Sequence, residues 1–194
     1  MSRSVAKTII MVTGLPGSGK TVFSKVAETM GIPVFRMGDV LREYAVEKGL
    51  DTTDETLGRL SLELRERYGR AVIAERTFEK IMGTNADIVV VEGLRNVEEF
   101  FFFREKAQNT VLVAIHASPN TRYARLRERG RSDDPSRWED FLTRDQRELN
   151  LGLGTVIALS DIILINDGKT IETFIDECRV TLRKLLARSQ GLST

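Results

Sequence analysis

Short apolar runs alternate along the chain with longer segments in which apolar residues recur every three or four positions. Five of these runs have the β-branched composition of buried strands, and they cover residues 8–13, 34–37, 87–93, 110–116 and 161–165. The third run has an unbroken apolar centre, which is typical of a strand buried on both faces of a parallel sheet. This alternation predicts an α/β fold with a doubly wound, five-stranded parallel sheet.

The segments between and after these runs have helical spacing and are bounded by glycine, proline and capping residues. The candidate N-caps are Thr53 or Asp54 for the third helix, Asn96 for the fifth and Ser136 for the seventh. The predicted helices cover residues 22–30, 38–49, 54–68, 71–82, 97–108, 119–129, 137–149, 155–159 and 171–188.

Four consecutive phenylalanines, Phe100 to Phe103, lie within the fifth predicted helix. Because successive residues of a helix point in different directions, the four rings cannot all face one core, and we expect one or two to be exposed. Two interpretations stay open: a bulky helix wedged between its neighbours, or a self-association patch that would support a homodimer.

The composition indicates one folded domain, since the 194 residues are 41% hydrophobic and 29% charged. The net charge of +1 argues against a general nucleic-acid-binding protein. The single cysteine, Cys178, excludes an internal disulfide and a cysteine-cluster metal site, and it fits a reducing compartment. No apolar run is long enough to span a membrane, so we expect a soluble, cytoplasmic protein.

The most specific signal is a glycine-rich loop between the first predicted strand and the first predicted helix. It reads Gly14-Leu15-Pro16-Gly17-Ser18-Gly19-Lys20-Thr21 and fits the phosphate-binding pattern G-x-x-x-x-G-K-[ST]. Backbone N–H groups and a helix N-terminus converge there on phosphate oxygens, and glycine lets the backbone approach closely. Lys20 can reach the β- and γ-phosphates, and the Thr21 hydroxyl can ligate Mg2+. The loop predicts binding of a nucleoside triphosphate with Mg2+.

Two acidic residues follow predicted strands, at the sheet edge where ligands collect in this class of fold. Glu92 ends the third strand, where an acid can hold Mg2+ directly or through water. Asp39 follows the second strand, and three interpretations stay open for it. It is a second ligand to Mg2+-bound water, a base for an acceptor hydroxyl, or an ordinary helix N-cap.

Arginines crowd the segment after the fourth predicted strand. Guanidinium groups can stabilise the charge that spreads over a migrating phosphoryl group, and a mobile lid that carries them would exclude water. We expect most of these arginines to lie on an exposed helix face, and we select Arg131 and Arg144, then Arg125, as candidates for the chemistry. The whole set is Arg122, Arg125, Arg127, Arg129, Arg131, Arg137, Arg144 and Arg147.

Two further arginines, Arg42 and Arg95, stand just beyond strand ends, where an acceptor phosphate could be held. In contrast, we interpret three other conspicuous residues as structural. His116 ends an apolar strand with no evident partner, Trp138 is a packing anchor, and Cys178 is a core thiol.

Further motifs follow the loop in a fixed order: Gly38 to Arg42, Glu92 to Arg95, Gly130 to Asp134 and Asn166 to Gly168. This order resembles that of adenylate kinases and related nucleoside monophosphate kinases over nearly the whole chain. The runs 131–135 and 149–159 are similar, more closely, to those of the archaeal UPF0200 group, described as adenylate-kinase-like or dephospho-CoA-kinase-like. The resemblance implies one P-loop kinase domain over residues 1–194, with a helical acceptor-binding insertion at about 39–83 and a short lid at about 119–149.

The resemblance also implies roles on the acceptor side. Arg42 and Arg95 match arginines that hold the acceptor's phosphate. Residues 51–83, however, do not match the acceptor-binding segment of adenylate kinases well, so the identity of the acceptor stays open.

On the donor side, Glu92 matches an aspartate that orders the Mg2+ shell, and Arg131 and Arg144 match lid arginines around the transferred phosphoryl group. Asn166 and Gly168 match the loop that lies against the adenine, so the resemblance assigns both to ATP binding.

The sequence thus predicts a kinase that moves the γ-phosphoryl group of Mg–ATP to a small nucleotide-like acceptor, a nucleoside monophosphate in the first place. Two alternatives remain. One is a hydroxyl acceptor of the dephospho-CoA type, for which Asp39 would serve as base. The other is a nucleotide-gated regulatory ATPase with a protein or RNA partner. Phosphoryl transfer depends on positioned charge, and the ordered arginines therefore favour the kinase.

Overall fold

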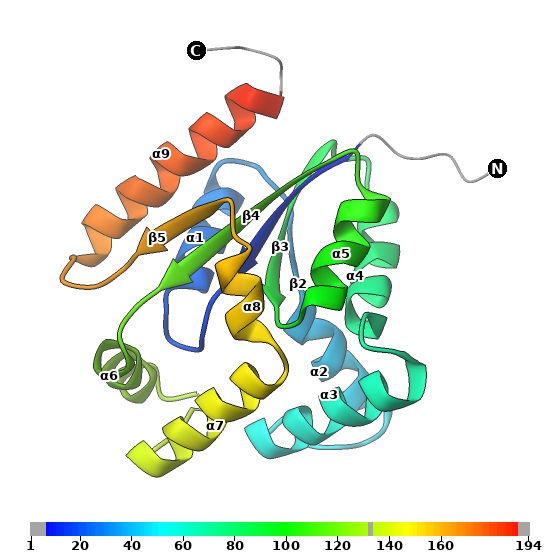
Figure 1. Ribbon diagram of the computed structural model, residues 1–194, viewed down its shortest axis with the longest axis vertical. Helices are drawn as coiled ribbons and strands as arrows, with labels where there is room; N and C mark the ends of the chain where they lie inside the picture. Colours follow the sequence, from blue (N-terminus) through cyan, green and yellow to red (C-terminus); the bar gives the residue numbers. More distant parts are fainter. Residues whose placement is uncertain (1–6, 132–133, 190–194) are drawn as a thin grey trace.

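Five parallel strands form one sheet in a computed structural model that describes residues 7–131 and 134–189 (Figure 1). The spatial order of the strands is β2-β3-β1-β4-β5, which confirms the predicted fold class. The strands are β1 (Thr8–Thr13), β2 (Val34–Arg36), β3 (Ile88–Leu94), β4 (Asn109–His116) and β5 (Ile162–Ile165).

The chain leaves the central strand β1 at the point where the strand order reverses. β1 pairs in parallel with β3 on one side and with β4 on the other. The next strands are added outward in both directions, β2 beyond β3 and β5 beyond β4. A crevice at the carboxyl end of such a switch point is where doubly wound folds bind their ligands.

Helices cover both faces of the sheet and its carboxyl end (Figure 1). α1 and α9 pack on one face and α4, α5 and α8 on the other, while α3, α6 and α7 lie beyond the carboxyl ends of the strands. The helices are α1 (Lys20–Thr29), α2 (Met37–Glu47), α3 (Asp54–Tyr68), α4 (Val72–Met82), α5 (Val97–Lys106), α6 (Pro119–Arg129), α7 (Trp138–Asn150), α8 (Leu153–Ala158) and α9 (Ile171–Ser189).

Alternate residues of β1 contribute to two separate apolar clusters. Ile9 and Met11 pack among residues of α2 to α5, whereas Ile10 and Val12 pack among residues of α1 and α9. All four side chains are at most 1% exposed. Burial on both faces explains why the strand reads as a continuous apolar run and not as an alternating one.

The predicted caps agree with the structure at two helices and fail at a third. The Thr53 hydroxyl accepts from the Thr56 N–H of α3, and the Asn96 side chain accepts from the Glu99 N–H of α5. Ser136 is not the N-cap of α7, because that helix begins one residue later, after Arg137. Trp138 is the first residue of α7, and its ring contacts the rings of Tyr123 and Phe141.

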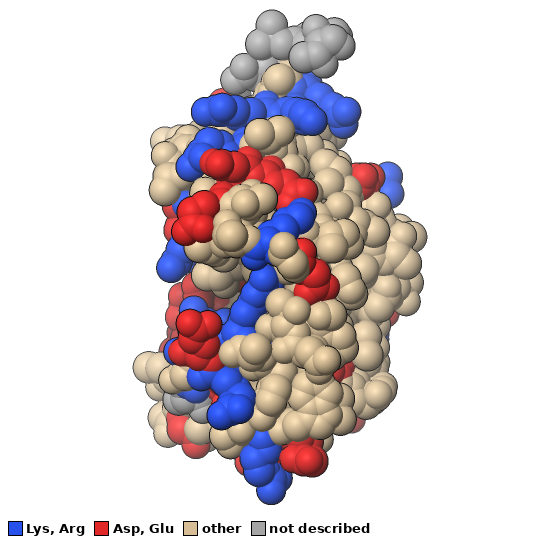
Figure 2. Space-filling model, turned by 90° about the vertical axis from the view of Figure 1, so that its left-hand side faces the viewer, with Lys and Arg blue, Asp and Glu red and all other residues tan. Residues whose placement is uncertain are grey.

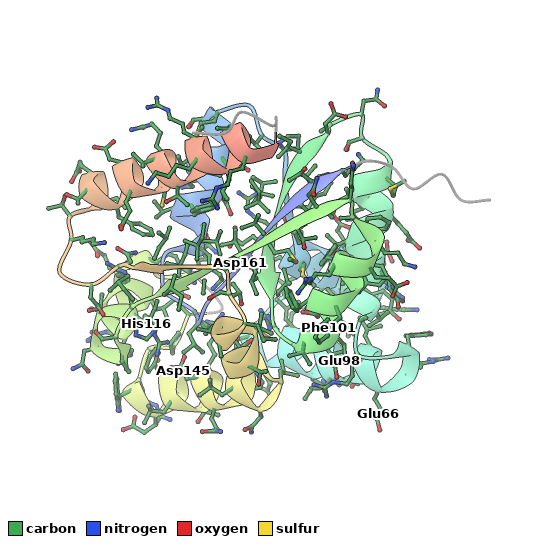
Figure 3. All side chains as sticks on the ribbon, turned by 45° about the horizontal axis from the view of Figure 1, so that its top comes forward. Glu66, Glu98, Phe101, His116, Asp145 and Asp161 are labelled. Carbon is green, nitrogen blue, oxygen red and sulfur yellow. The ribbon has the colours of Figure 1, made fainter. Side chains whose placement is uncertain are left out.

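The phenylalanine run of α5 divides between core and surface. Phe100 and Phe103 are buried, and Phe102 meets the Phe78 ring edge to face at 5.7 Å. Phe101 is 56% exposed (labelled in Figure 3), so one ring of the four points to solvent, as expected. Within the two described ranges, no helix is sufficiently long and apolar to cross a membrane.

Candidate active site

The loop from Gly14 to Gly19 joins the carboxyl end of β1 to the first turn of α1. Gly17 has a φ of +81°, and a Cβ at this position would lie 2.7 Å from the carbonyl oxygen of Arg122. A side chain there would suffer both backbone strain and a collision with the backbone of α6. Packing as well as conformation therefore requires glycine at this point of the loop.

Lys20 opens α1, and its ammonium group lies within its own loop. Nζ donates to the carbonyl oxygens of Gly14, at 2.6 Å, and Leu15, at 3.1 Å. Burial lowers the pKa of Lys20 to about 8, although the nearby carboxylates of Glu92 and Glu148 oppose this shift. An anionic phosphate would supply stronger acceptors for the same donor than the two carbonyl groups do.

Thr21 and Glu92 meet where the sequence predicts Mg2+. Thr21 Oγ1 donates to Glu92 Oε1 at 3.2 Å. The other carboxylate oxygen, Oε2, is buried without a hydrogen-bond partner among the described residues, and it lies 3.5 Å from Arg36 Nε. A hydroxyl group and an under-coordinated carboxylate are oxygen ligands of the kind Mg2+ takes. Within the described ranges, no group of three His, Cys, Asp or Glu side chains gathers, so phosphate and water oxygens would have to complete the shell.

Two cavities open beside the loop. We name them after the roles that the sequence predicts for their residues. The acceptor-side cavity, about 510 Å³, extends toward Asp39, Thr52 and Glu148, and the donor-side cavity, about 400 Å³, extends toward Lys25, Arg125 and Arg144. The two share one wall, formed by Pro16, Lys20, Thr21, Arg42, Glu92, Arg95 and Arg131. The wall shared by the two cavities therefore contains the P-loop lysine, the predicted metal ligands, both predicted acceptor arginines and one predicted lid arginine.

Basic side chains dominate the donor-side cavity. Glu92 is the only acid in its described wall, against eight lysines and arginines: Lys20, Lys25, Arg42, Arg95, Arg125, Arg129, Arg131 and Arg144. Figure 2 views the molecule from the side of α6 and α9, and it shows lysine and arginine side chains in a line along this side. A cavity with so large an excess of positive charge is suited to a polyanion such as a triphosphate.

The two predicted acceptor arginines each face an acid in the acceptor-side cavity. Arg42 Nη1 lies 3.1 Å from Asp39 Oδ1 on the first turns of α2, and both side chains are substantially exposed. Arg95 Nη1 lies 2.9 Å from Glu148 Oε1 of α7. The Arg95 backbone N–H donates to Glu99 Oε2 at 2.8 Å, which fixes the chain just after β3.

The two predicted lid arginines differ in their surroundings. Arg131 is exposed and lines both cavities. Arg144 is only 9% exposed, and its guanidinium lies 3.2 Å from Asp54 Oδ1 of α3 and 3.6 Å from Asp134 Oδ1. Two residues of the predicted motif between Arg131 and Asp134, at positions 132 and 133, lie outside the described residues.

The predicted adenine loop lies against the P-loop. Asn166 Nδ2 donates to the Ser18 carbonyl oxygen at 2.8 Å, and Arg125 Nη2 donates to the Asn166 carbonyl oxygen at 2.9 Å. Arg125, Asn166 and Lys169 line a further cavity of about 520 Å³ that includes Gly19. Gly168 takes a φ of +62° in the turn that follows Asn166.

Arg122 is buried, in contrast to the exposed helix face that the sequence predicts for most arginines of its segment. Its side chain is 2% exposed and pairs with Asp145 of α7 (labelled in Figure 3) through Nη1–Oδ1 and Nη2–Oδ2 contacts of 2.7 and 2.5 Å. It also donates to the Pro16 carbonyl oxygen of the P-loop at 3.3 Å. One signal was available, because Arg122 stands four residues before Leu126 and therefore on the buried side of α6.

Sequence reasoning also missed Arg36 and Glu148, which line the acceptor-side cavity. Arg36 ends β2 and therefore belongs to the edge of the sheet where the other candidates were found. Glu148 stands four residues after Arg144, on the same side of α7. Both positions follow from simple spacing rules, but neither residue belongs to a recognisable motif.

Comparisons with known proteins agree with this geometry. The family model AAA_18, described as an AAA domain, matches residues 10–148. A shikimate kinase from Bacteroides thetaiotaomicron has a similar fold, with a TM-score of 0.61 and 16% identity over 92% of this chain and 98% of that one. A gluconokinase from Sinorhizobium meliloti gives a TM-score of 0.57 and 21% identity over the whole of both chains. At such identities the likeness concerns the fold alone, and fold and loop together define a P-loop kinase-like domain.

Relatives in archaea are much more similar. A UPF0200 protein of Hyperthermus butylicus is 48% identical over 95% of this chain and 96% of its own length. One from Pyrococcus abyssi is 43% identical over 92% of this chain and 97% of its own length. The chain belongs to the UPF0200 family.

Proposed function

We propose that this protein is a kinase that transfers the γ-phosphoryl group of ATP to a small nucleotide-like acceptor, a nucleoside monophosphate in the first place. The observation that carries the proposal is the wall shared by the two cavities, which contains Lys20, Thr21, Arg95 and Arg131. A triphosphate on one side and an acceptor on the other would meet at Lys20. This is the arrangement that in-line phosphoryl transfer requires, because the protein contributes mainly position and charge.

The donor would bind through the loop and through α1. Backbone N–H groups of residues 14–21 and the N-terminus of α1 would hold its phosphates, with Lys20 at the β- and γ-phosphates. Thr21 and Glu92 would hold Mg2+, which would neutralise part of the charge of the phosphate groups. Arg125 and Asn166 border the cavity that would take the base.

The acceptor would bind in the acceptor-side cavity. Arg42 and Arg95 would hold its phosphate, since a guanidinium group can donate two parallel hydrogen bonds to a phosphate. Arg131 would approach the transferred phosphoryl group from the shared wall. Arg144 would do so only after exchanging its contacts with Asp54 and Asp134. A phosphate acceptor is already ionised near neutral pH, so this reaction needs no general base.

A hydroxyl acceptor is the second candidate, and the position of Asp39 favours it. Asp39 is a half-exposed carboxylate on the acceptor side, where it could accept the proton of an attacking hydroxyl group. Shikimate kinase and gluconokinase share the fold. Asp39→Asn separates the candidates: a severe loss of rate with ATP binding preserved supports a hydroxyl acceptor, and a small effect supports a phosphate acceptor.

The test is ADP release from Mg–ATP, without acceptor and with AMP, CMP, UMP, GMP, dephospho-CoA or a free nucleoside. We expect clear stimulation by one acceptor, lost in Lys20→Ala and in Arg95→Ala. A slow rate that no acceptor changes would refute the kinase. It would favour a regulatory ATPase whose rate responds to a protein or RNA partner.

A cytoplasmic location and a homodimer also remain proposals. The first is supported by the single, buried Cys178. The second would have to bury Phe101, the largely exposed ring of the phenylalanine run. Light scattering of the purified protein measures its oligomeric state directly.

A further inference from the structure

Glu148 is a buried carboxylate in the acceptor-side cavity. Phosphoryl transfer to a phosphate acceptor does not require it. Its side chain is 3% exposed and projects from α7 to Arg95, with Oε1 at 2.9 Å from Arg95 Nη1. The same oxygen lies 4.0 Å from Arg147 Nη2. Its charge is also felt at Lys20, where it opposes the lowering of the lysine pKa. Glu148 therefore lies close to both the acceptor arginine and the reaction centre.

The contact with Glu148 limits which ligands the Arg95 guanidinium can bind. The Arg95 side chain is 30% exposed, so part of the guanidinium faces the cavity while another part contacts Glu148. A phosphate bound to Arg95 would lie near a carboxylate that has almost no contact with water. Two like charges at short distance in a poorly solvated place repel strongly. A hydroxyl group, in contrast, can donate a hydrogen bond to a carboxylate.

A second pair in the lining of the same cavity repeats the pattern. Arg42 and Asp39 form a guanidinium–carboxylate pair at 3.1 Å. Apolar side chains are few in the described lining and come from Pro16, Leu94 and Leu153. A wall that alternates hydrogen-bond donors and acceptors in this way is complementary to a ligand that carries hydroxyl groups beside an anionic group.

We propose that Glu148 is a specificity-determining residue, which disfavours bare anions at Arg95 and selects small acceptors that carry hydroxyl groups next to their phosphate. The inference rests on the proposed function, because it assigns the acceptor to this cavity. It narrows the acceptor to the class of hydroxylated organic phosphates, in which the sugar phosphate portion of a nucleotide is included. Glu148 would repel a bare anion by its charge and accept a hydrogen bond from a hydroxyl group of the ligand.

Glu148→Gln tests the charge directly, because the amide oxygen can still accept from Arg95 while the negative charge is removed. With the donor site filled by Mg2+ and the ATP analogue AMP-PNP, inorganic phosphate is titrated by calorimetry. We expect phosphate to bind more tightly to Glu148→Gln, by on the order of tenfold. Arg95→Ala should abolish the gain. Glu139→Gln removes the same charge from an exposed position on α7 and should leave phosphate affinity unchanged.

A second measurement needs no variant. In the unmodified protein, glycerol 3-phosphate and ribose 5-phosphate should bind more tightly than inorganic phosphate under the same conditions. The inference is overturned if phosphate binds equally well to Glu148→Gln and to the unmodified protein, or if hydroxyl groups on the ligand bring no gain. Failure of the kinase proposal would appear separately, as ADP release that no acceptor stimulates.

Discussion

Replacing Asp145 with alanine should destabilise the protein strongly, because it leaves the Arg122 guanidinium buried without its counter-ion. The two side chains form a two-pronged ion pair, and Arg122 is 2% and Asp145 12% exposed. Removing one partner of a buried pair costs about 3–5 kcal/mol. In a chain of this size about 1 kcal/mol lowers the melting temperature by roughly 2–4 °C. The expected fall is therefore on the order of 10 °C.

Thermal unfolding followed by circular dichroism measures this fall. Asp140→Ala is the matched control, because it removes from the same helix an exposed carboxylate, which pairs with Arg137 just before the helix. Exposed ion pairs contribute little, so the control should melt close to the unmodified protein. If Asp145→Ala melts no lower than the control, the pair contributes nothing and the reasoning from burial is wrong. Replacing both partners, as Arg122→Met with Asp145→Leu, should recover much of the loss, since no buried charge then remains.

Three further outcomes follow from the site and the core. Because burial lowers the pKa of Lys20 to about 8, ATP affinity should be level below pH 8. The affinity should weaken as the pH rises further, because Lys20 must then take up a proton when ATP binds. Titration of a fluorescent ATP analogue between pH 6.5 and 9.5 measures the affinity, which in Lys20→Met should not fall with pH in this way. Gly17→Ala should abolish ATP binding in the same titration, because the added Cβ collides with the backbone of Arg122. Gly49→Ala is the control and should leave ATP binding unchanged, since Gly49 also has a positive φ, of +67°, but has no atom within 4 Å of the added Cβ. Burial raises the pKa of Cys178 to about 12, so iodoacetamide should label this thiol only as fast as the protein unfolds, and rapid labelling in the native state would contradict the buried position.

The sequence determined the fold class and the P-loop, because both can be recognised from short stretches of the chain. The β1 run Ile9 to Val12 is apolar throughout, which is the mark of a strand covered on both faces, and the structure covers it on both. Gly14 to Thr21 needs only its own residues and its position between strand and helix to be recognised. The rule that ligands bind at the carboxyl ends of parallel strands predicts that Asp39, Glu92 and Arg95 lie at one edge of the sheet, and all three line the same cavity.

Tertiary structure decided which charged residues meet. Arg122 with Asp145, Arg95 with Glu148 and Arg147 with Asp54 each join elements that are separate along the chain. No periodicity predicts such pairs, since they depend on how α7 crosses α3, α6 and the end of β3. The spacing of α7 shows that it has a polar face, but a polar face is normally a solvated one. Only the packing of α7 against the other elements buries part of that face and places Arg144 and Glu148 in the lining of the two cavities.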